Sequence, residues 1–170
     1  RYNVFYHPFF AIKFTFPEGW DLDNLPDRLI IRNNNSEVTM ISDNLLRDDI
    51  ENGLTPKDYL DQNIDKTSFL ARNTLLEQKN INSGLPGYTY LYETKALSEK
   101  SYTRYTVFFD IDDNDKRPKA WIFIKKFKEV NDDNQLKVID ETFTKMTEDE
   151  IAKAKGLRIK VIRFRRGMSY

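Results

Sequence analysis

A segment of alternating apolar and polar side chains near the start of the chain constrains the fold most strongly. In residues 10–16 the even-numbered positions are all Phe or Ile, whereas the odd-numbered positions carry Ala, Lys and Thr. Because successive side chains of a strand point to opposite faces, this pattern predicts a half-buried β-strand. Pro17 and Gly19 end it, since proline lacks a backbone donor and glycine allows the chain to turn. We expect Trp20 to pack back over the strand and to anchor the core.

Further strands are predicted wherever similar apolar segments lie between turn residues. The best of them is residues 102–111 followed by 120–127, joined as a long hairpin. Residues 69–82 are ambiguous because their apolar side chains fit neither a helical nor a strand period well, although 75–81 could be a strand. Residues 21–27 are predicted to be a polar loop. The remaining predicted strands are 28–32, 37–42, 88–94 and 157–164.

Two or three helices are predicted from local signals. Thr55 followed by Pro56 is a typical helix start, with threonine as the N-cap. A second helix over residues 131–146 follows from the helical spacing of four apolar side chains, Leu136, Ile139, Phe143 and Met146. Residues 147–150, Thr-Glu-Asp-Glu, form a capping-box sequence that predicts a short third helix.

The order of these elements predicts the α+β class, a mainly antiparallel sheet with two to three helices packed on it. We expect residues 1–146 to form a single α+β domain. Residues 147–170 would add a helix–strand extension, packed on this domain or continuing beyond it. The chain starts with Arg1 rather than Met, and we interpret it as part of a longer precursor.

The charge and composition of the chain exclude several classes of protein. Lys and Arg total 27, as do Asp and Glu, so the net charge is zero. General nucleic-acid binding requires a surplus of cations, which argues against a nucleic-acid partner. No apolar run approaches the 18 residues of a transmembrane helix. The absence of cysteine rules out disulfides and thiolate metal sites, and glycines occur singly rather than in a phosphate-binding loop.

His7 is the only histidine and therefore the first candidate for catalysis. A zinc hydrolase of the HEXXH type needs two histidines on one helix, and a Cys–His pair is impossible here. A Ser–His–Asp triad would depend on a histidine next to Pro8 in an aromatic segment. These considerations favour a structural role for His7 at the start of the strand.

The acidic segment 110–115, Asp-Ile-Asp-Asp-Asn-Asp, is the candidate cation site. An EF-hand loop needs Gly at its sixth position and Glu at its twelfth, where this chain has Asp115 and Trp121. We interpret the segment as a solvated hairpin tip, with cation binding left open as the basis of a possible enzyme.

Two basic clusters, residues 125–128 and 163–166, are the candidates for contacts with anions. Each lies in an alternating segment, so we interpret both as basic polar faces of strands rather than as a nucleic-acid surface. Carboxylate pairs for acid–base chemistry cannot be distinguished among the 27 acids. The sequence thus predicts no catalytic, cofactor-binding or metal-ligating residue.

Several short motifs resemble segments found downstream of the protease domain in bacterial zinc metalloproteases of the HtpX/BepA type. The first is HPFFAIKFTFPEGWDLDN, from His7 to Asn24, and a second is the Gly84–Pro86 turn. The far end is similar as well, in residues 142–150 and 157–161 and in Gly167. The chain departs from the family pattern where Lys145 replaces an arginine and where Met168-Ser169 follows Gly167.

This resemblance implies a non-catalytic accessory domain at the C-terminus of a secreted or envelope zinc metalloprotease, serving substrate or partner binding, or regulation. The zinc ligands and catalytic glutamate of that family lie upstream in a motif that is missing here, so no site residue is carried over and zinc is expected only in the upstream domain. The implied partners are that protease domain, protein substrates and envelope proteins. The implied location is the bacterial periplasm or envelope.

A second resemblance concerns the order of elements, which is similar to the PsbP/Mog1-like α/β/α sandwich. Proteins of that fold are binding modules. The alternative function is therefore a free-standing envelope binding protein, such as a lipoprotein, with no protease partner. A fold-level similarity says little about function by itself.

Overall fold

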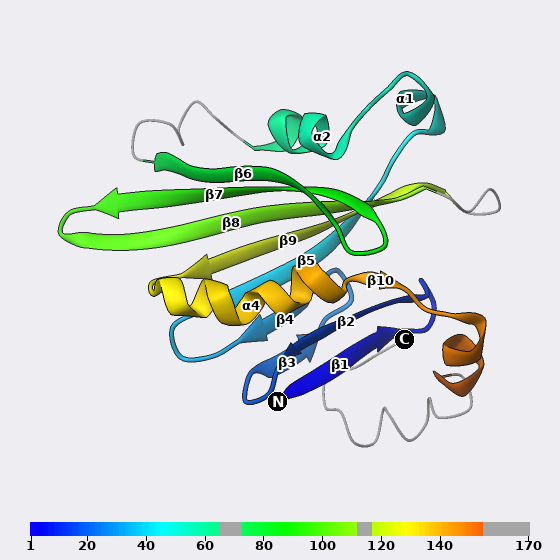
Figure 1. The fold of residues 1–170 in the computed structure, drawn as a ribbon, viewed down its shortest axis with the longest axis horizontal. Helices are drawn as coiled ribbons and strands as arrows, with labels where there is room; N and C mark the ends of the chain where they lie inside the picture. The colour runs from blue at the N-terminus through cyan, green and yellow to red at the C-terminus, as the bar shows by residue number, and fades with distance from the viewer. Residues whose placement is uncertain (65–72, 112–116, 155–170) are drawn as a thin grey trace.

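A seven-stranded antiparallel sheet lies at the centre of the structure (Figure 1). The structure is a computed structural model that describes residues 1–64, 73–111 and 117–154. The arrangement confirms the α+β class and the mainly antiparallel pairing predicted from the sequence. In spatial order the strands are β3 (Asp21–Asn24), β4 (Leu29–Arg32), β5 (Glu37–Asn44), β9 (Lys119–Phe127), β8 (Glu99–Asp110), β7 (Pro86–Ala96) and β6 (Asn73–Asn82).

A second, smaller sheet contains β1 (Tyr2–His7), β2 (Ile12–Pro17) and the two-residue β10 (Thr144–Lys145). Strand β2 is the predicted alternating strand, but it begins at Ile12 because Ala11 has a φ of 56° and turns the chain. Strand β1 was not predicted. It pairs with β2 along its whole length, so the opening stretch is a hairpin rather than a single strand.

The helix starts follow the capping signals. Helix α2 (Pro56–Asn63) opens with reciprocal bonds between Thr55 and Asp58, each 3.1 Å long. Thr147 and Glu150 form the same capping box at 3.0 and 3.1 Å, and residues 148–154 are helical as predicted. The other helices are α1 (Arg47–Glu51) and α4 (Val130–Thr142).

Helix α4 ends four residues earlier than predicted. Phe143 is extended, and the next two residues pair with β2 as β10. Phe143 and Met146 are nevertheless buried, so the apolar spacing marks a continuous buried face that extends beyond the helix.

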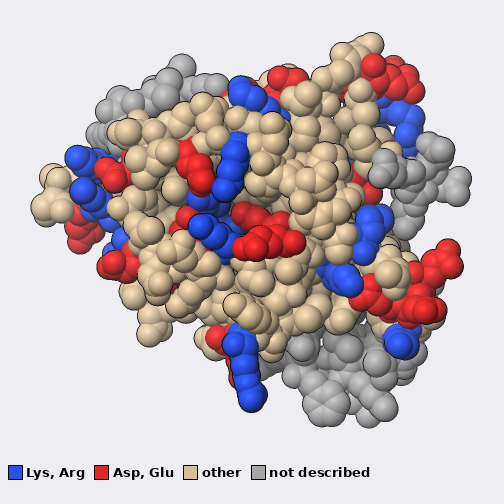
Figure 2. Space-filling model, viewed as in Figure 1, with Lys and Arg blue, Asp and Glu red and all other residues tan. Residues whose placement is uncertain are grey.

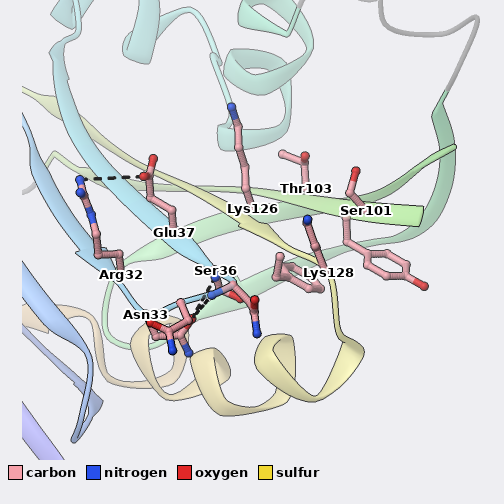
Figure 3. A pocket seen from close by; sticks show the side chains of 12 residues that line it. Arg32, Asn33, Ser36, Glu37, Ser101, Thr103, Lys126 and Lys128 are labelled. Carbon is pink, nitrogen blue, oxygen red and sulfur yellow. Dashed lines mark hydrogen bonds and ion pairs between the residues drawn. The ribbon is translucent and has the colours of Figure 1, made fainter. Parts of the chain in front are cut away.

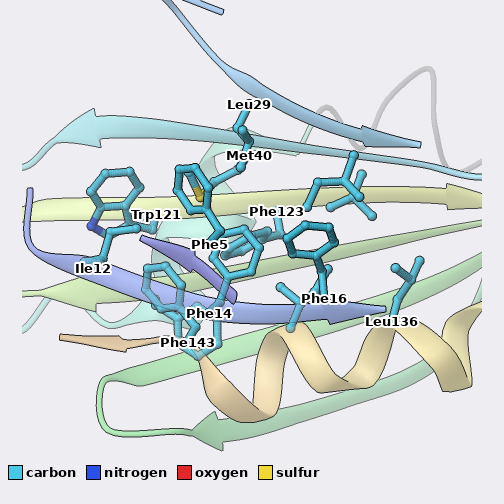
Figure 4. Close-up of a cluster of buried hydrophobic side chains, with 14 of the residues drawn as sticks. Phe5, Ile12, Phe14, Phe16, Leu29, Met40, Trp121, Phe123, Leu136 and Phe143 are labelled. Atoms are coloured by element: carbon cyan, nitrogen blue, oxygen red, sulfur yellow. The ribbon is translucent and has the colours of Figure 1, made fainter. Parts of the chain in front are cut away.

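Two hydrophobic clusters cover the two faces of the large sheet. One lies between the sheet and the layer made by α4 and β1–β2, and it is rich in phenylalanine (Figure 4). The other lies between the opposite face and the layer of α1 and α2, and it is rich in tyrosine. Trp20 is buried in the first cluster, as its expected role in the core requires. In the described part of the chain, no helix is long and apolar enough to cross a membrane.

Two segments, one predicted as a polar loop and one left ambiguous, form the edge strands of the large sheet. Residues 21–24 form β3 rather than a loop, and the polar side chains there alternate with Leu22, which packs against the core. In β6 the register shifts between Leu75 and Glu77, and this bulge interrupts the alternation that would have identified a strand. The predicted strand 157–164 lies outside the described residues.

The Gly84–Pro86 turn between β6 and β7 docks beside the end of α4. Ser83 donates a hydrogen bond to the carbonyl oxygen of Phe143, and Leu85 is buried in the core. Gly84 has a φ of 129°, and a Cβ there would lie 2.4 Å from Oγ1 of Thr144. Glycine is therefore required both by backbone conformation and by the close approach of β10.

Candidate binding site

A pocket of about 400 Å³ lies at one end of the large sheet (Figure 3). Its lining comes from three parts of the chain: residues 32–37 at the β4–β5 turn, residues 101–103 of β8 and residues 126–128 at the end of β9. The strand register brings them together, since Lys126 pairs with Glu37 on one side and with Thr103 on the other. We call this the basic pocket.

The β4–β5 turn is held in a defined shape on one side of the basic pocket. The side-chain oxygen of Asn33 accepts hydrogen bonds from the backbone N–H groups of Asn35 and Ser36, at 3.0 and 2.9 Å. The hydroxyl of Ser36 donates to Asp132 in the first turn of α4, at 2.6 Å. Asparagine at the start of such a turn replaces a backbone acceptor, so the turn is fixed locally and by the helix.

Cations predominate in the lining. Arg32, Lys126 and Lys128 carry three positive charges against the single carboxylate of Glu37. The Arg32–Glu37 ion pair is long, at 3.9 Å, and both side chains are about half exposed. The hydroxyls of Ser101 and Thr103 add hydrogen-bond donors to the lining (Figure 3). A pocket with a surplus of cations and neutral donors is suited to an anionic group such as a carboxylate or phosphate.

A buried polar network lies between the sheet and α4. Arg104 forms a bidentate pair with Asp133 through Nε and Nη2, at 2.8 and 2.9 Å, and both side chains are more than nine-tenths buried. Nη2 also donates to Glu77 at 2.6 Å. Burial alone lowers the pKa of Arg104, but the hydrogen bonds and charges of Asp133 and Glu77 outweigh it and raise that pKa above its usual value.

Lys125 is the second buried cation of this network. Its side chain is fully buried, and its ammonium lies 2.8 Å from Oδ2 of Asp140 and 3.3 Å from the carbonyl oxygen of Leu136. The prediction that residues 125–128 form a basic polar strand face is therefore wrong for Lys125, which points toward α4. It holds for Lys126 and Lys128, which are exposed and line the basic pocket. The second cluster, 163–166, lies outside the described residues.

His7 lies at the end of β1, in surroundings that differ from those of a catalytic base. Its ring packs against Phe5, Phe10 and Trp121, and its Nδ1 accepts a hydrogen bond from the backbone N–H of Phe10 at 3.3 Å. Burial lowers its pKa to about 4. These contacts agree with the expected structural role at the start of the alternating strand.

The acidic segment 110–115 is described only at its first two residues. The carboxylate of Asp110 forms an ion pair with the ammonium of Lys145 in β10, at 2.8 Å. Residues 112–115 lie outside the described part of the chain. Within the described ranges, no group of three or more His, Cys, Asp or Glu side chains is arranged to hold a metal ion.

Several polar residues buried between α4 and the sheet were not predicted, although the sequence contains a pattern that indicates them. In the α4-facing positions of β8, Arg104 and Thr106 precede the apolar Phe108. In α4, Asp133 and Asp140 share the helical spacing of the buried Leu136. Charged residues in an apolar register on both elements indicate a buried ion pair. Arg32 and the hydroxyls of β8 carried no such signal, because only the fold brings them together.

The fold is similar to that of several solved structures. LpqN, described as involved in cell envelope biogenesis of Mycobacterium tuberculosis, has a TM-score of 0.58 at 10% identity, over 86% of this chain and 91% of LpqN. A point mutant of the protein Mog1 has a TM-score of 0.58 at 9% identity, over 89% and 99%. A Bacteroides thetaiotaomicron protein has a TM-score of 0.51 at 8% identity, over 86% and 49%.

These similarities establish the Mog1-like fold that the order of elements suggested. No family model matches the chain. No curated protein matches it either.

Proposed function

We propose that this chain is a non-catalytic binding protein of the bacterial cell envelope, and that the basic pocket holds an anionic group of its ligand. The observation that carries the proposal is the surplus of cations around the pocket, with Arg32, Lys126 and Lys128 facing only the carboxylate of Glu37. The volume of about 400 Å³ lies within the range of about 300–1,000 Å³ that is typical of small-molecule sites.

The fold supports the class of protein. LpqN shares the arrangement and is described as involved in cell envelope biogenesis, which favours an envelope location for this chain. Fractionation of the native cell tests that part of the proposal. Recovery of the protein in the envelope or periplasm is expected, and recovery in the cytosol would contradict it.

The ligand-binding part is tested by isothermal titration calorimetry with inorganic phosphate as the probe. Lys126→Gln and Lys128→Gln should each weaken binding about tenfold, because each removes one charge-assisted hydrogen bond. Lys153→Gln is the matched control, since Lys153 is an exposed lysine of the 148–154 helix. Added salt should weaken binding to the wild type, as exposed charges are screened. Absence of saturable heat, or equal weakening by the control, would refute the anion site.

The accessory-domain alternative rests on the motifs shared with HtpX/BepA-type proteases. In this structure these motifs have packing roles, since Trp20 and Leu85 are buried in the same core and Gly84 is required beside β10. Such roles fit a free-standing protein as well as an accessory domain. The gene sequence upstream of Arg1 decides between them: an encoded HEXXH motif supports the protease parent, and a leader sequence alone supports the free-standing protein.

A further inference from the structure

The basic pocket is a notch at the place where β9 ends beside the longer β8. Tyr102 of β8 pairs with Phe127, the last residue of β9, and within the described ranges no strand pairs with residues 99–101 on that side. The β4–β5 turn closes the other side of the notch. A ligand bound there can therefore contact the end of the sheet as well as the cations.

Two aromatic rings form part of the lining of this notch. The rings of Tyr102 and Phe127 are stacked nearly parallel, with centroids 5.4 Å apart and 16° between their planes. Phe127 is buried, whereas Tyr102 is half-buried, so the tyrosine ring is the one that a ligand can reach. An aromatic face of this kind packs well against a flat, apolar face of a ligand.

Three consecutive residues of β8 bring hydroxyl groups to the same notch. Ser101, Tyr102 and Thr103 are all half-buried, and their hydroxyls form no hydrogen bond with another described residue. The three oxygens are not buried from solvent, so a ligand can reach them. Strand alternation places Ser101 and Thr103 on the opposite face from Tyr102, so the notch gathers groups from both faces of the sheet. A hydroxyl both donates and accepts, which suits a ligand that itself carries hydroxyls.

The surplus of positive charge at the basic pocket is local. Figure 2 shows basic and acidic side chains interspersed across the described part of one face of the molecule. A polyanion would need an extended basic surface, which this mixture does not provide. A small ligand with one acidic group is the better match for the cations of the pocket.

We propose that the basic pocket binds an acidic monosaccharide, a sugar ring that carries one carboxylate. This inference rests on the anion-binding function proposed above and adds the body of the ligand. The carboxylate lies toward Lys126 and Lys128, and the C–H groups on one face of the ring pack on Tyr102. The sugar hydroxyls exchange hydrogen bonds with the β8 hydroxyls and with the amide side chains of Asn34 and Asn35, which also line the pocket.

The test is isothermal titration calorimetry with D-glucuronate. D-glucose has the same ring without the charge, and acetate has the charge without the ring, so each uses only part of the site. D-glucuronate should bind at least about tenfold more tightly than either of them. Benzoate, a carboxylate on a flat aromatic ring, should also bind more weakly, because it cannot satisfy the hydroxyl and amide groups of the notch.

The tyrosine ring is tested by substitution. Tyr102→Leu should weaken D-glucuronate binding about tenfold and leave the binding of inorganic phosphate unchanged, because only the contact with the sugar ring is lost. Tyr102→Phe keeps the ring and should weaken D-glucuronate binding less than Tyr102→Leu does. Tyr2→Leu, at an exposed tyrosine of β1, is the matched control. Circular dichroism shows whether Tyr102→Leu folds, and if it does not, Asn34→Ala in the exposed turn carries the test by the same comparison.

The outcomes separate this inference from the proposed function. If phosphate binds but D-glucuronate binds no more tightly than acetate, the sugar is wrong and the anion site stands. If neither phosphate nor D-glucuronate gives saturable heat, both proposals are wrong. Benzoate binding as tightly as D-glucuronate would overturn the sugar in favour of an aromatic acid. A Tyr102→Leu variant that binds D-glucuronate as tightly as the Tyr2→Leu control would also overturn it.

Discussion

Helix α4 packs on one face of the sheet in two different ways. Along one edge, Leu136 and Ile139 are fully buried, together with Phe143 just after the helix, among phenylalanines of β2, β8 and β9 (Figure 4). Along its other edge, Asp133 and Asp140 form ion pairs with Arg104 and Lys125 of the same sheet. We call these the apolar and the polar part of the α4 interface.

The two parts of the interface contribute differently to the fold. The apolar part supplies most of the stability, and the polar part fixes the position of α4 on the sheet. Apolar burial is non-directional and contributes most of the favourable free energy of folding. A buried ion pair contributes little net stability, because desolvation offsets the attraction, but its geometry permits few alternatives. The Ser36–Asp132 bond joins the β4–β5 turn of the basic pocket to α4 one residue before Asp133 of the polar part.

The largest effect is expected in the apolar part. Phe143 stacks on Phe108 at 4.8 Å between ring centroids and meets Phe123 edge-on at 5.3 Å. Phe143→Ala should lower the free energy of unfolding by about 3–5 kcal/mol, measured by urea denaturation. Trp20→Ala should fall in the same range. Phe9→Ala is the control, because Phe9 is 73% exposed. A loss below about 1 kcal/mol for Phe143→Ala would contradict the division of the interface.

Removing one partner of an ion pair in the polar part should lower the free energy of unfolding by nearly as much. Asp133→Ala leaves the charge of Arg104 buried with only the half-exposed Glu77 beside it. A loss of about 3 kcal/mol is expected by the same measurement. Asp23→Ala, at an exposed position of β3, should change stability by less than about 0.5 kcal/mol. Equal effects of the two substitutions would mean that the Arg104–Asp133 pair is solvated.

His7 extends the comparison to a titratable group whose ring packs against the aromatic side chains of Phe5, Phe10 and Trp121. The folded-state pKa of His7 is about 4, below its ordinary value of 6.5. Between these values the unfolded chain binds more protons than the folded chain. Stability is therefore complete above pH 6.5 and falls as the pH drops toward 4, by up to about 1.4 kcal/mol per pH unit.

His7→Leu should remove this component. Denaturation of the two proteins across the same pH range should give a smaller slope for the variant, and the difference isolates His7 from the carboxylates that titrate nearby. Parallel curves would show that His7 is not held neutral by its packing.

The smallest effect is expected from the hydroxyl chain in the polar part. Thr89 is buried and links Arg104 to Thr106. Thr89→Val keeps the shape but removes both bonds, and should cost about 1–2 kcal/mol. Thr74→Val, on the exposed edge strand β6, is the matched control and should be nearly neutral. A neutral Thr89→Val would show that the hydroxyls contribute nothing to holding Arg104.

The parts of the fold that depend on local sequence could be predicted. Thr55 and Thr147 specify helix starts through bonds within one turn of chain, and the alternation around Phe14 specifies a strand. Strands β1 and β3 were missed because few of their side chains are buried, only Phe5 in β1 and none in β3, so no apolar alternation marks them.

The candidate sites could be predicted only in part. Lys126 and Lys128 were identified as a basic surface, yet their neighbours Arg32 and Ser101 reach the same pocket only through the strand register. Lys125 shares the face of Phe123 and Phe127, and it was misassigned because a lysine is expected in solvent unless a carboxylate of another element, here Asp140, pairs with it.

The central claim is that the polar part of the interface fixes the position of α4 and adds little stability. Its most direct test is the double variant Arg104→Met with Asp133→Leu, compared with Asp133→Ala by urea denaturation. Apolar side chains of similar size remove both charges at once, so no uncompensated charge remains. We predict that the double variant unfolds within about 1 kcal/mol of the wild type, while Asp133→Ala alone loses about 3 kcal/mol. A double variant that is as unstable as the single one would contradict the account, because the ion pair itself would then supply the stability.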